Sequence, residues 1–349
     1  MPSTARFNIP ALRVGTVVVL ALGGLVGCSA PAPVATPAVL RPTVPRPTPP
    51  PRPPALVDLA DAQARLAAGG SLTYPEVIAL RRTLVGSPAD LPDSRAHAPY
   101  ATAEAARETR ERTFTAHLET CRLTDALGWI AYWQPADRSS PSTPQQPMQV
   151  AVYMYDPYAP SEAQNSSAPD VLLLGWTRAQ TAAFHAGEPI RFSGSWTLEA
   201  GQEAVRAVQY AAVAEAPNPT LTPPAVGSDV QIELSRAMCF GPCPDYTVTI
   251  TGDGQVTFNG HYYTRVTGSA TTRIAANRMQ ELLAEIQKTE FFALADSYDA
   301  QITDLPTYSV AVQWQGRSKR VRDYAVGPRK LRILEDRIDE LVNADQWIK

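Results

Sequence analysis

The stretch that organises this sequence is Cys239-Phe240-Gly241-Pro242-Cys243-Pro244-Asp245-Tyr246. It lies between two runs that alternate apolar and polar residues, Val230–Leu234 and Tyr246–Ile250, and it holds two of the four cysteines. Such alternation predicts two half-buried strands. Gly241-Pro242 favours a tight reversal between them. The stretch therefore predicts a strand–turn–strand unit at the start of a C-terminal domain.

The remaining C-terminal residues predict an α+β domain over 229–349. Two amphipathic helices are expected, one from Ile274 to about Lys288 and one opened by Pro328. Further strands are expected at Gln255–Phe258, Tyr308–Trp314 and Lys319–Tyr324. We expect an antiparallel sheet with both helices on one face.

The N-terminus predicts export. Arg6 and Arg13 precede an apolar run, 14–26, which is shorter than the ~20 residues of a membrane-spanning helix and is typical of a secretory signal. The run ends in Leu25-Val26-Gly27-Cys28. This ending resembles the signal of bacterial lipoproteins. The alternative is an ordinary signal in which the cysteine has no role.

The lipoprotein resemblance implies a location and an anchor. Residues 1–27 would be removed, and Cys28 would carry diacylglyceryl and palmitate-type chains that tie the protein to a membrane. Two or three such chains anchor stably, because each buried CH₂ contributes ~0.8 kcal/mol. Ser29, in place of Asp, resembles cargo sent to the periplasmic face of the outer membrane in a diderm bacterium.

Residues 28–55 predict a tether. Pro31–Pro54 is so rich in proline that it can neither coil nor pair, and a polyproline II spacer is expected. At ~3.1 Å per residue it reaches at most ~75 Å. Such a stalk would hold the globular part clear of the lipid or thread cell-wall polymer.

Residues 56–127 predict a helical segment, with apolar residues at spacings of three and four. The longest helix is expected from Ala103 to about Leu123. Cys121 continues its apolar face from Phe114 and Leu118. A buried free thiol is therefore favoured over a nucleophile, and pairing of Cys121 between two chains is left open.

Residues 128–215 predict a β domain of five short strands with a helical turn before the fourth. The piece Gly187–Gly194 is similar to a recurrent motif of OB-fold domains in bacterial envelope proteins. The resemblance implies a small five-stranded OB-like barrel, a fold that binds oligonucleotides or oligosaccharides through aromatic side chains. The aromatic residues that would form such a ligand face are Trp129, Trp133, Tyr153 and Tyr155. The favoured alternative is that they pack in the core.

Three chemistries are open to Cys239 and Cys243. A disulfide is favoured, because an exported protein meets an oxidising compartment. Gly-Pro-Cys resembles the thioredoxin site, but three residues separate these thiols and a predicted strand follows. The helix N-terminus that would stabilise a thiolate is therefore not predicted there. Two thiolates make only half of a zinc site, and His261 is the only histidine of this domain.

The motif at Cys239–Tyr246 also carries a family resemblance. Together with Asp253-Gly254, Phe291-Phe292 and Thr303–Pro306, it resembles a bacterial domain of unknown function that occurs in secreted proteins and lipoproteins. The resemblance implies a domain boundary, with residues 216–228 as a Pro-rich linker, and an envelope setting. It implies no activity.

The composition and the motifs narrow the classes of function that the sequence allows. The formal net charge is −3 and no long block carries a single sign, which argues against nucleic-acid binding. No phosphate loop, Gly-x-Ser-x-Gly or His-Glu-x-x-His motif occurs. We expect no enzymatic activity, cofactor or metal, and a role in interaction, binding or scaffolding, with a cell-wall polymer or an envelope protein as partner. The alternatives are glycan binding by the middle domain and thiol–disulfide exchange.

Overall fold

The computed structural model describes residues 57–137, 142–159, 168–213, 229–300 and 304–348. The chain divides into two units, Met1–Pro54 and Ala55–Lys349, and every described residue belongs to the second. The predicted lipidation site Cys28, the tether and the linker 216–228 lie outside the described residues. No helix within the described ranges is long and apolar enough to cross a membrane.

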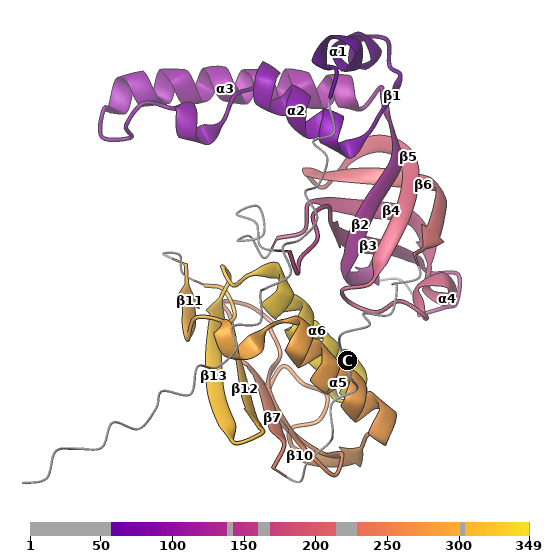
Figure 1. The fold of residues 1–349 in the computed structure, drawn as a ribbon, viewed down its shortest axis with the longest axis vertical. Helices are drawn as coiled ribbons and strands as arrows, with labels where there is room; N and C mark the ends of the chain where they lie inside the picture. Colours follow the sequence, from indigo (N-terminus) through magenta and orange to yellow (C-terminus); the bar gives the residue numbers. More distant parts are fainter. Residues whose placement is uncertain (1–56, 138–141, 160–167, 214–228, 301–303, 349) are drawn as a thin grey trace, which may run out of the picture. The chain divides into compact units, whose positions relative to one another are not determined.

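A closed five-stranded barrel forms the first β module (Figure 1). The strand order is β2-β3-β4-β6-β5, and β5 closes the barrel on β2. All pairs are antiparallel except β4 with β6. The helical turn α4 (Arg178–Thr181) precedes the fourth strand of the barrel, which confirms the OB-like prediction. The strands are β2 (Arg122–Pro135), β3 (Pro147–Tyr153), β4 (Val171–Thr177), β5 (Pro189–Glu199) and β6 (Gln202–Ala212).

Gly194 allows the barrel to bend. It lies where the β5–β6 register shifts, and a Cβ at this position would stand 2.2 Å from the carbonyl oxygen of Arg206. No other residue type fits so close an approach of two backbones. On either side of it, Phe192 and Trp196 point into the barrel core.

The N-terminal helices share one core with the barrel. Leu66, Leu80 and Phe114 pack in the same buried cluster as Ile130 and Val150. The helices are α1 (Leu59–Ala67), α2 (Tyr74–Leu84) and α3 (His97–Leu118), with the short strand β1 (Ser71–Leu72) and the 3₁₀ turn η1 (Pro88–Asp90) between them. The residues predicted as a helical segment therefore complete the barrel's core.

The expected extension of the long helix to Leu123 is wrong. α3 ends at Leu118, and Arg122 already belongs to β2, so the β module starts before Gly128. The reason is tertiary: Arg122 pairs with Ser71 of β1 and with Ser195 of β5, and these ladders prevail over the helical spacing. Cys121, between the two elements, is a buried free thiol.

The C-terminal domain is a seven-stranded sheet with α5 (Ala276–Lys288) and α6 (Arg329–Val342) packed side by side on one face (Figure 1). The order is β10-β9-β8-β7-β12-β13-β11. The α+β prediction is confirmed, with β11 added as an unexpected parallel edge strand. The strands are β7 (Gln231–Arg236), β8 (Asp245–Thr251), β9 (Gln255–Tyr262), β10 (Gly268–Arg273), β11 (Ser297–Asp299), β12 (Tyr308–Trp314) and β13 (Arg317–Tyr324), with the 3₁₀ turn η3 (Phe291–Ala293) and the last helix α7 (Asp345–Ile348).

Within the unit Ala55–Lys349, α6 contacts the barrel through a buried patch. Ile333 of α6 packs in one cluster with Tyr153 and Leu172 of the barrel strands. Arg329, at the start of α6, donates to Asp170 at 2.7 Å and lies over the ring of Tyr153. A buried arginine needs such a partner, because an unpaired buried charge is costly.

Candidate functional site

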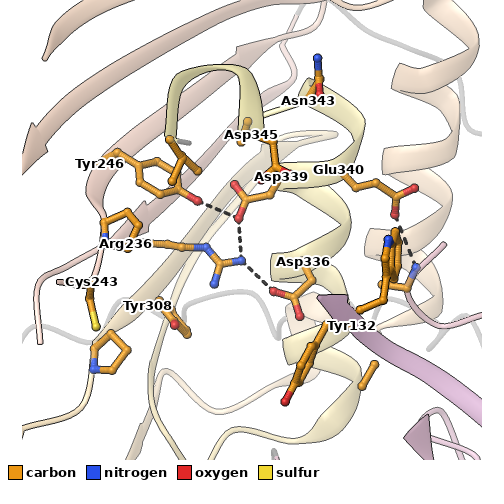
Figure 2. A pocket seen from close by; sticks show the side chains of 17 residues that line it. Tyr132, Arg236, Cys243, Tyr246, Tyr308, Asp336, Asp339, Glu340, Asn343 and Asp345 are labelled. Carbon is orange, nitrogen blue, oxygen red and sulfur yellow. Dashed lines mark hydrogen bonds and ion pairs between the residues drawn. The ribbon is translucent and has the colours of Figure 1, made fainter. Parts of the chain in front are cut away.

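A pocket of about 450 Å³ lies beside the C-terminal half of α6 (Figure 2). This volume is in the range of small-molecule binding sites. Most of its lining comes from the C-terminal domain, and one wall comes from β2 of the barrel. The lining residues are Ala131, Tyr132, Trp133, Ala186, Arg236, Cys243, Pro244, Tyr246, Pro306, Tyr308, Asp336, Asp339, Glu340, Asn343, Ala344, Asp345 and Ile348.

Strand alternation places Arg236 in this pocket. Ile232, Leu234 and Arg236 point to the same face of β7, since side chains of one face recur every second residue. The first two are fully buried in the sheet–helix core. Arg236 is the last residue of the strand, so its guanidinium reaches the edge of that core and is 9% exposed.

Helical periodicity places the acidic partners. Asp336, Asp339 and Glu340 follow one another at spacings of three and one on α6, and residues three or four apart share a helix face. In Figure 2 the side chains of Asp336 and Asp339 turn toward Arg236. The helix ends at Asn343, which has the left-handed conformation of a C-cap.

Arg236 bridges two carboxylates. Its Nη2 lies 2.8 Å from Oδ1 of Asp336 and 2.6 Å from Oδ2 of Asp339. The same Oδ2 accepts a hydrogen bond of 2.8 Å from the hydroxyl of Tyr246, on the neighbouring strand β8. Charge-assisted bonds of this kind hold side chains in fixed positions. The wall of the pocket is therefore pre-organised.

Burial and neighbouring charges change the pKa values of Asp339, Tyr246 and Arg236. Burial raises the pKa of Asp339, and the positive charge of Arg236 opposes that rise. Burial also raises the pKa of Tyr246 well above its ordinary value, and the charge of Asp339 raises it further. Burial alone would lower the pKa of Arg236, but Asp339, Tyr246 and Asp336 outweigh it and raise that pKa. Arg236 therefore stays charged and Tyr246 stays a hydrogen-bond donor.

Two buried atoms of the group have no partner among the described residues: Nε of Arg236, a donor, and Oδ1 of Asp339, an acceptor. A buried polar atom without a partner costs about 1–3 kcal/mol. The ion-paired group therefore keeps one unused donor and one unused acceptor inside the protein.

Further charged side chains, Arg332 and Glu335, lie next to this group. The ring of Tyr308 faces two guanidinium groups, Arg236 at 4.5 Å and Arg332 at 4.2 Å from its centroid. Arg332 also donates to Glu335 at 3.3 Å. Glu335 is 1% exposed, and burial raises its pKa to about 8.

The stretch Cys239–Tyr246 borders this site. Cys239 and Cys243 form a disulfide with Cα atoms 5.6 Å apart, within the usual range. It closes the connection between β7 and β8 within one loop, and the next element is the strand β8 rather than a helix. Cys243 lines the pocket. His261 is hydrogen-bonded to Asp245 at 2.8 Å.

The comparison with known families matches the C-terminal domain. Residues 230–342 match the family "Domain of unknown function (DUF6438)". Among curated proteins, none matches the chain. The matched residues include the bridging Arg236, its partners Asp336 and Asp339, and Tyr246. The matched range runs from the start of β7 to the end of α6.

The four predicted ligand-face aromatics do not gather on one face. Tyr153 is 1% exposed and packs with Trp129 against α6. Trp133 and Tyr155 are half-buried and pack against the barrel core instead. The bulge in β2 between Ile130 and Tyr132 separates the two tryptophans. Of the four, only Trp133 lines the pocket.

Sequence reasoning missed the charged group beside the disulfide loop Cys239–Cys243. One signal was available: Arg236 continues the inward positions of an alternating strand, where an apolar residue is expected. A second was available in α6, where Glu335 falls on the face that holds Leu331, Leu334 and Ile338. Within the described residues, no group of three or more His, Cys, Asp or Glu side chains has the arrangement of a metal site.

Proposed function

We propose that this protein is a lipid-anchored binding protein of the bacterial cell envelope, without enzymatic activity, whose ligand occupies the pocket beside Arg236. The observation that carries the proposal is the pre-organised wall of that pocket. Arg236, Asp336, Asp339 and Tyr246 fix one another at 2.6–2.8 Å, so little side-chain order remains to be lost on binding.

The cell-envelope setting is supported by sequence. Leu25-Val26-Gly27-Cys28 resembles a lipoprotein signal, and Pro31–Pro54 is suited to hold a domain away from lipid. The disulfide between Cys239 and Cys243 is in keeping with an oxidising compartment.

The pairing of the charged side chains in the pocket favours a binding role over catalysis. Arg236 and Arg332 together pair with Asp336 and Asp339, and Arg337 lies 2.8 Å from Glu340. Charged side chains that are held in ion pairs orient a ligand through the donors and acceptors that the ion pairs leave unused. The pocket is favoured over the four aromatics of the barrel because those aromatics pack in two separate clusters.

The anchor is tested by metabolic labelling with an alkyne analogue of palmitate in a diderm bacterial host. The wild-type chain is expected to be labelled and to sediment with outer membranes. Cys28→Ala is expected to lose the label. Equal labelling of the two chains, or no labelling of either, would contradict the anchor.

The binding role is tested by thermal melting in the presence of soluble fragments from an enzymatic digest of purified cell envelopes. The wild-type chain is expected to melt at a higher temperature with the fragments than without them. Pro306→Trp fills the pocket and should abolish the shift, whereas Val326→Trp, at an exposed position outside the pocket, should preserve it. A shift retained by Pro306→Trp, or none in the wild type, would overturn the pocket as a binding site. Chemical breakdown of the fragments that requires Asp339 would overturn the absence of enzymatic activity.

A further inference from the structure

We propose that one end of the C-terminal sheet docks on a lipid bilayer, with Phe240 of the disulfide loop inserted among the lipid chains and Tyr262 and Tyr263 at the level of the headgroups. This contact is separate from ligand binding in the pocket. It rests on the proposed lipid anchor at Cys28, which keeps a bilayer within reach of the domain.

Large apolar side chains are exposed at this end of the sheet. Phe240 is 88% exposed, the most of any large apolar side chain among the described residues. Met238 of the same loop, Tyr262, Tyr263 and Leu305 are exposed as well. Single exposed apolar residues are common on protein surfaces, whereas a group of them marks a surface that contacts another apolar phase.

Strand pairing brings these residues to the same end. Arg236, the last residue of β7, pairs with Tyr308, the first of β12, and Asp245, the first of β8, pairs with Tyr262, the last of β9. The connection between β7 and β8, the end of β9 and the segment before β12 therefore leave the sheet together. The four strands are adjacent in the order β9-β8-β7-β12, so these segments span about 15 Å.

The connection between β7 and β8 is suited to lipid, because most of its backbone donors have a partner inside the protein or are absent. The N–H groups of Ala237 and Phe240 donate to backbone carbonyls of the segment before β12, at 2.9 and 3.3 Å. Gly241 donates within the loop at 2.9 Å, and Pro242 and Pro244 have no N–H. Paired backbone groups avoid the cost that lipid imposes on free ones. The disulfide across the loop limits the conformational order that docking would remove.

The charges at this end favour a zwitterionic lipid surface. No residue of 237–244 or of 305–307 is charged. Asp245, which follows the loop, is hydrogen-bonded to His261 at 2.8 Å, and Arg265 donates to a backbone carbonyl. A basic cluster that would attract anionic lipids is absent from these segments. Burial of apolar side chains is therefore the driving force.

The anchor makes so small an apolar surface sufficient. A second contact by a protein that is already tethered is intramolecular, so a weak contact is populated. The tether Pro31–Pro54 reaches at most ~75 Å. It limits the largest distance between domain and lipid and allows shorter ones, because a stalk can tilt. Tyr262 and Tyr263 suit the border of the contact, since tyrosine joins an apolar ring to a polar hydroxyl.

Insertion of Phe240 is tested by ¹⁹F NMR of the full lipidated chain, labelled with 4-fluorophenylalanine, in phosphatidylcholine nanodiscs. Nitroxide groups on the lipid chains broaden the signals of nuclei that lie among those chains. The Phe240 signal, assigned by its loss in Phe240→Leu, is expected to vanish when the nitroxide lipid is present. The signal of Phe291, which is buried in the domain core, is assigned by Phe291→Leu and is expected to persist. Persistence of both signals would overturn the insertion of Phe240.

Contact by the whole domain is measured by neutron reflectometry of the full lipidated chain on a supported phosphatidylcholine bilayer. The wild type is expected to form a protein layer directly against the headgroups. The double variant Phe240→Ser/Leu305→Ser should move this layer away from the headgroups. Leu198→Ser, which removes an exposed leucine from the barrel strand β5, should leave the layer in place.

The outcomes separate the docking from the anchor. A layer that stands away from the headgroups in the wild type would overturn the docking and leave the anchor intact. A layer that stays against the headgroups in the double variant would overturn the assignment of the contact to this end of the sheet. The absence of any layer would overturn the anchor and the docking together, because neither then holds the protein on lipid.

Discussion

At the scale of single residues, Arg236 is the side chain that holds the candidate site together. Its Nη2 atom forms ion pairs with both Asp336 and Asp339, whose carboxylates would otherwise repel each other in a buried position. Removal of one partner from a buried ion pair costs far more than loss of an exposed pair, because the charge left behind has no solvent. This difference makes the burial of Arg236 testable.

We expect Arg236→Met to destabilise the protein by about 3–5 kcal/mol. The matched control is Arg320→Met, which removes an ion pair to Glu233 from a side chain that is 55% exposed and should cost less than about 1 kcal/mol. Urea denaturation measures both. Equal costs for the two variants would contradict the account of a buried bridging arginine.

Glu335 gives a pH dependence. Its pKa of about 8 in the folded protein lies above its ordinary 4.5, so the folded state holds the proton more tightly than the unfolded state. The stability that this proton contributes is complete below pH 4.5 and is lost as the pH rises toward 8. The loss is about 1.4 kcal/mol per pH unit at most within that window.

The wild type should therefore be less stable at pH 8 than at pH 5, as measured by urea denaturation, and Glu335→Gln should flatten this dependence. The exposed Glu290→Gln serves as the control and should retain the wild-type slope. Parallel slopes in the wild type and Glu335→Gln would show that Glu335 titrates as an ordinary glutamate.

At the scale of elements, Gly194 is the position where the barrel tolerates no side chain. A Cβ there would meet the backbone of Arg206 at 2.2 Å, and backbone, unlike a flexible side chain, cannot move aside cheaply. We expect Gly194→Ala to cost about 1–3 kcal/mol, read from thermal or urea unfolding. Ser195→Ala, at the exposed neighbouring position, should be nearly neutral. A well-folded Gly194→Ala with unchanged stability would contradict the close strand approach.

Local patterns in the sequence were enough to predict most elements. Alternation in Tyr246–Ile250 and Tyr308–Trp314 predicted β8 and β12, and Pro328 correctly opened α6. Local patterns failed at Arg122, whose strand depends on partners at Ser71 and Ser195. Pairing between residues far apart in the chain leaves no local trace, and for the same reason the parallel strand β11 was not foreseen.

At the scale of the whole described unit, the candidate site was beyond local reasoning. Its wall joins Trp133 of β2 to Asp339 of α6, which lie on separate modules of the sequence. The sequence did indicate the disulfide loop and one of the aromatics. It did not indicate that Arg236 and α6 meet there, because that depends on the strand order that sets β7 at the centre of the sheet.

The central claim is that the pocket beside Arg236 binds a ligand from the cell envelope. It is tested most directly by ¹H–¹⁵N NMR of the arginine Nε groups during titration with soluble envelope fragments. The Arg236 signal is assigned by its loss in Arg236→Lys. We predict that this signal shifts saturably with the fragments in the wild type and stays in place in Pro306→Trp. A signal that stays in place while the fragments bind the wild type, or that shifts equally in Pro306→Trp, would contradict the account.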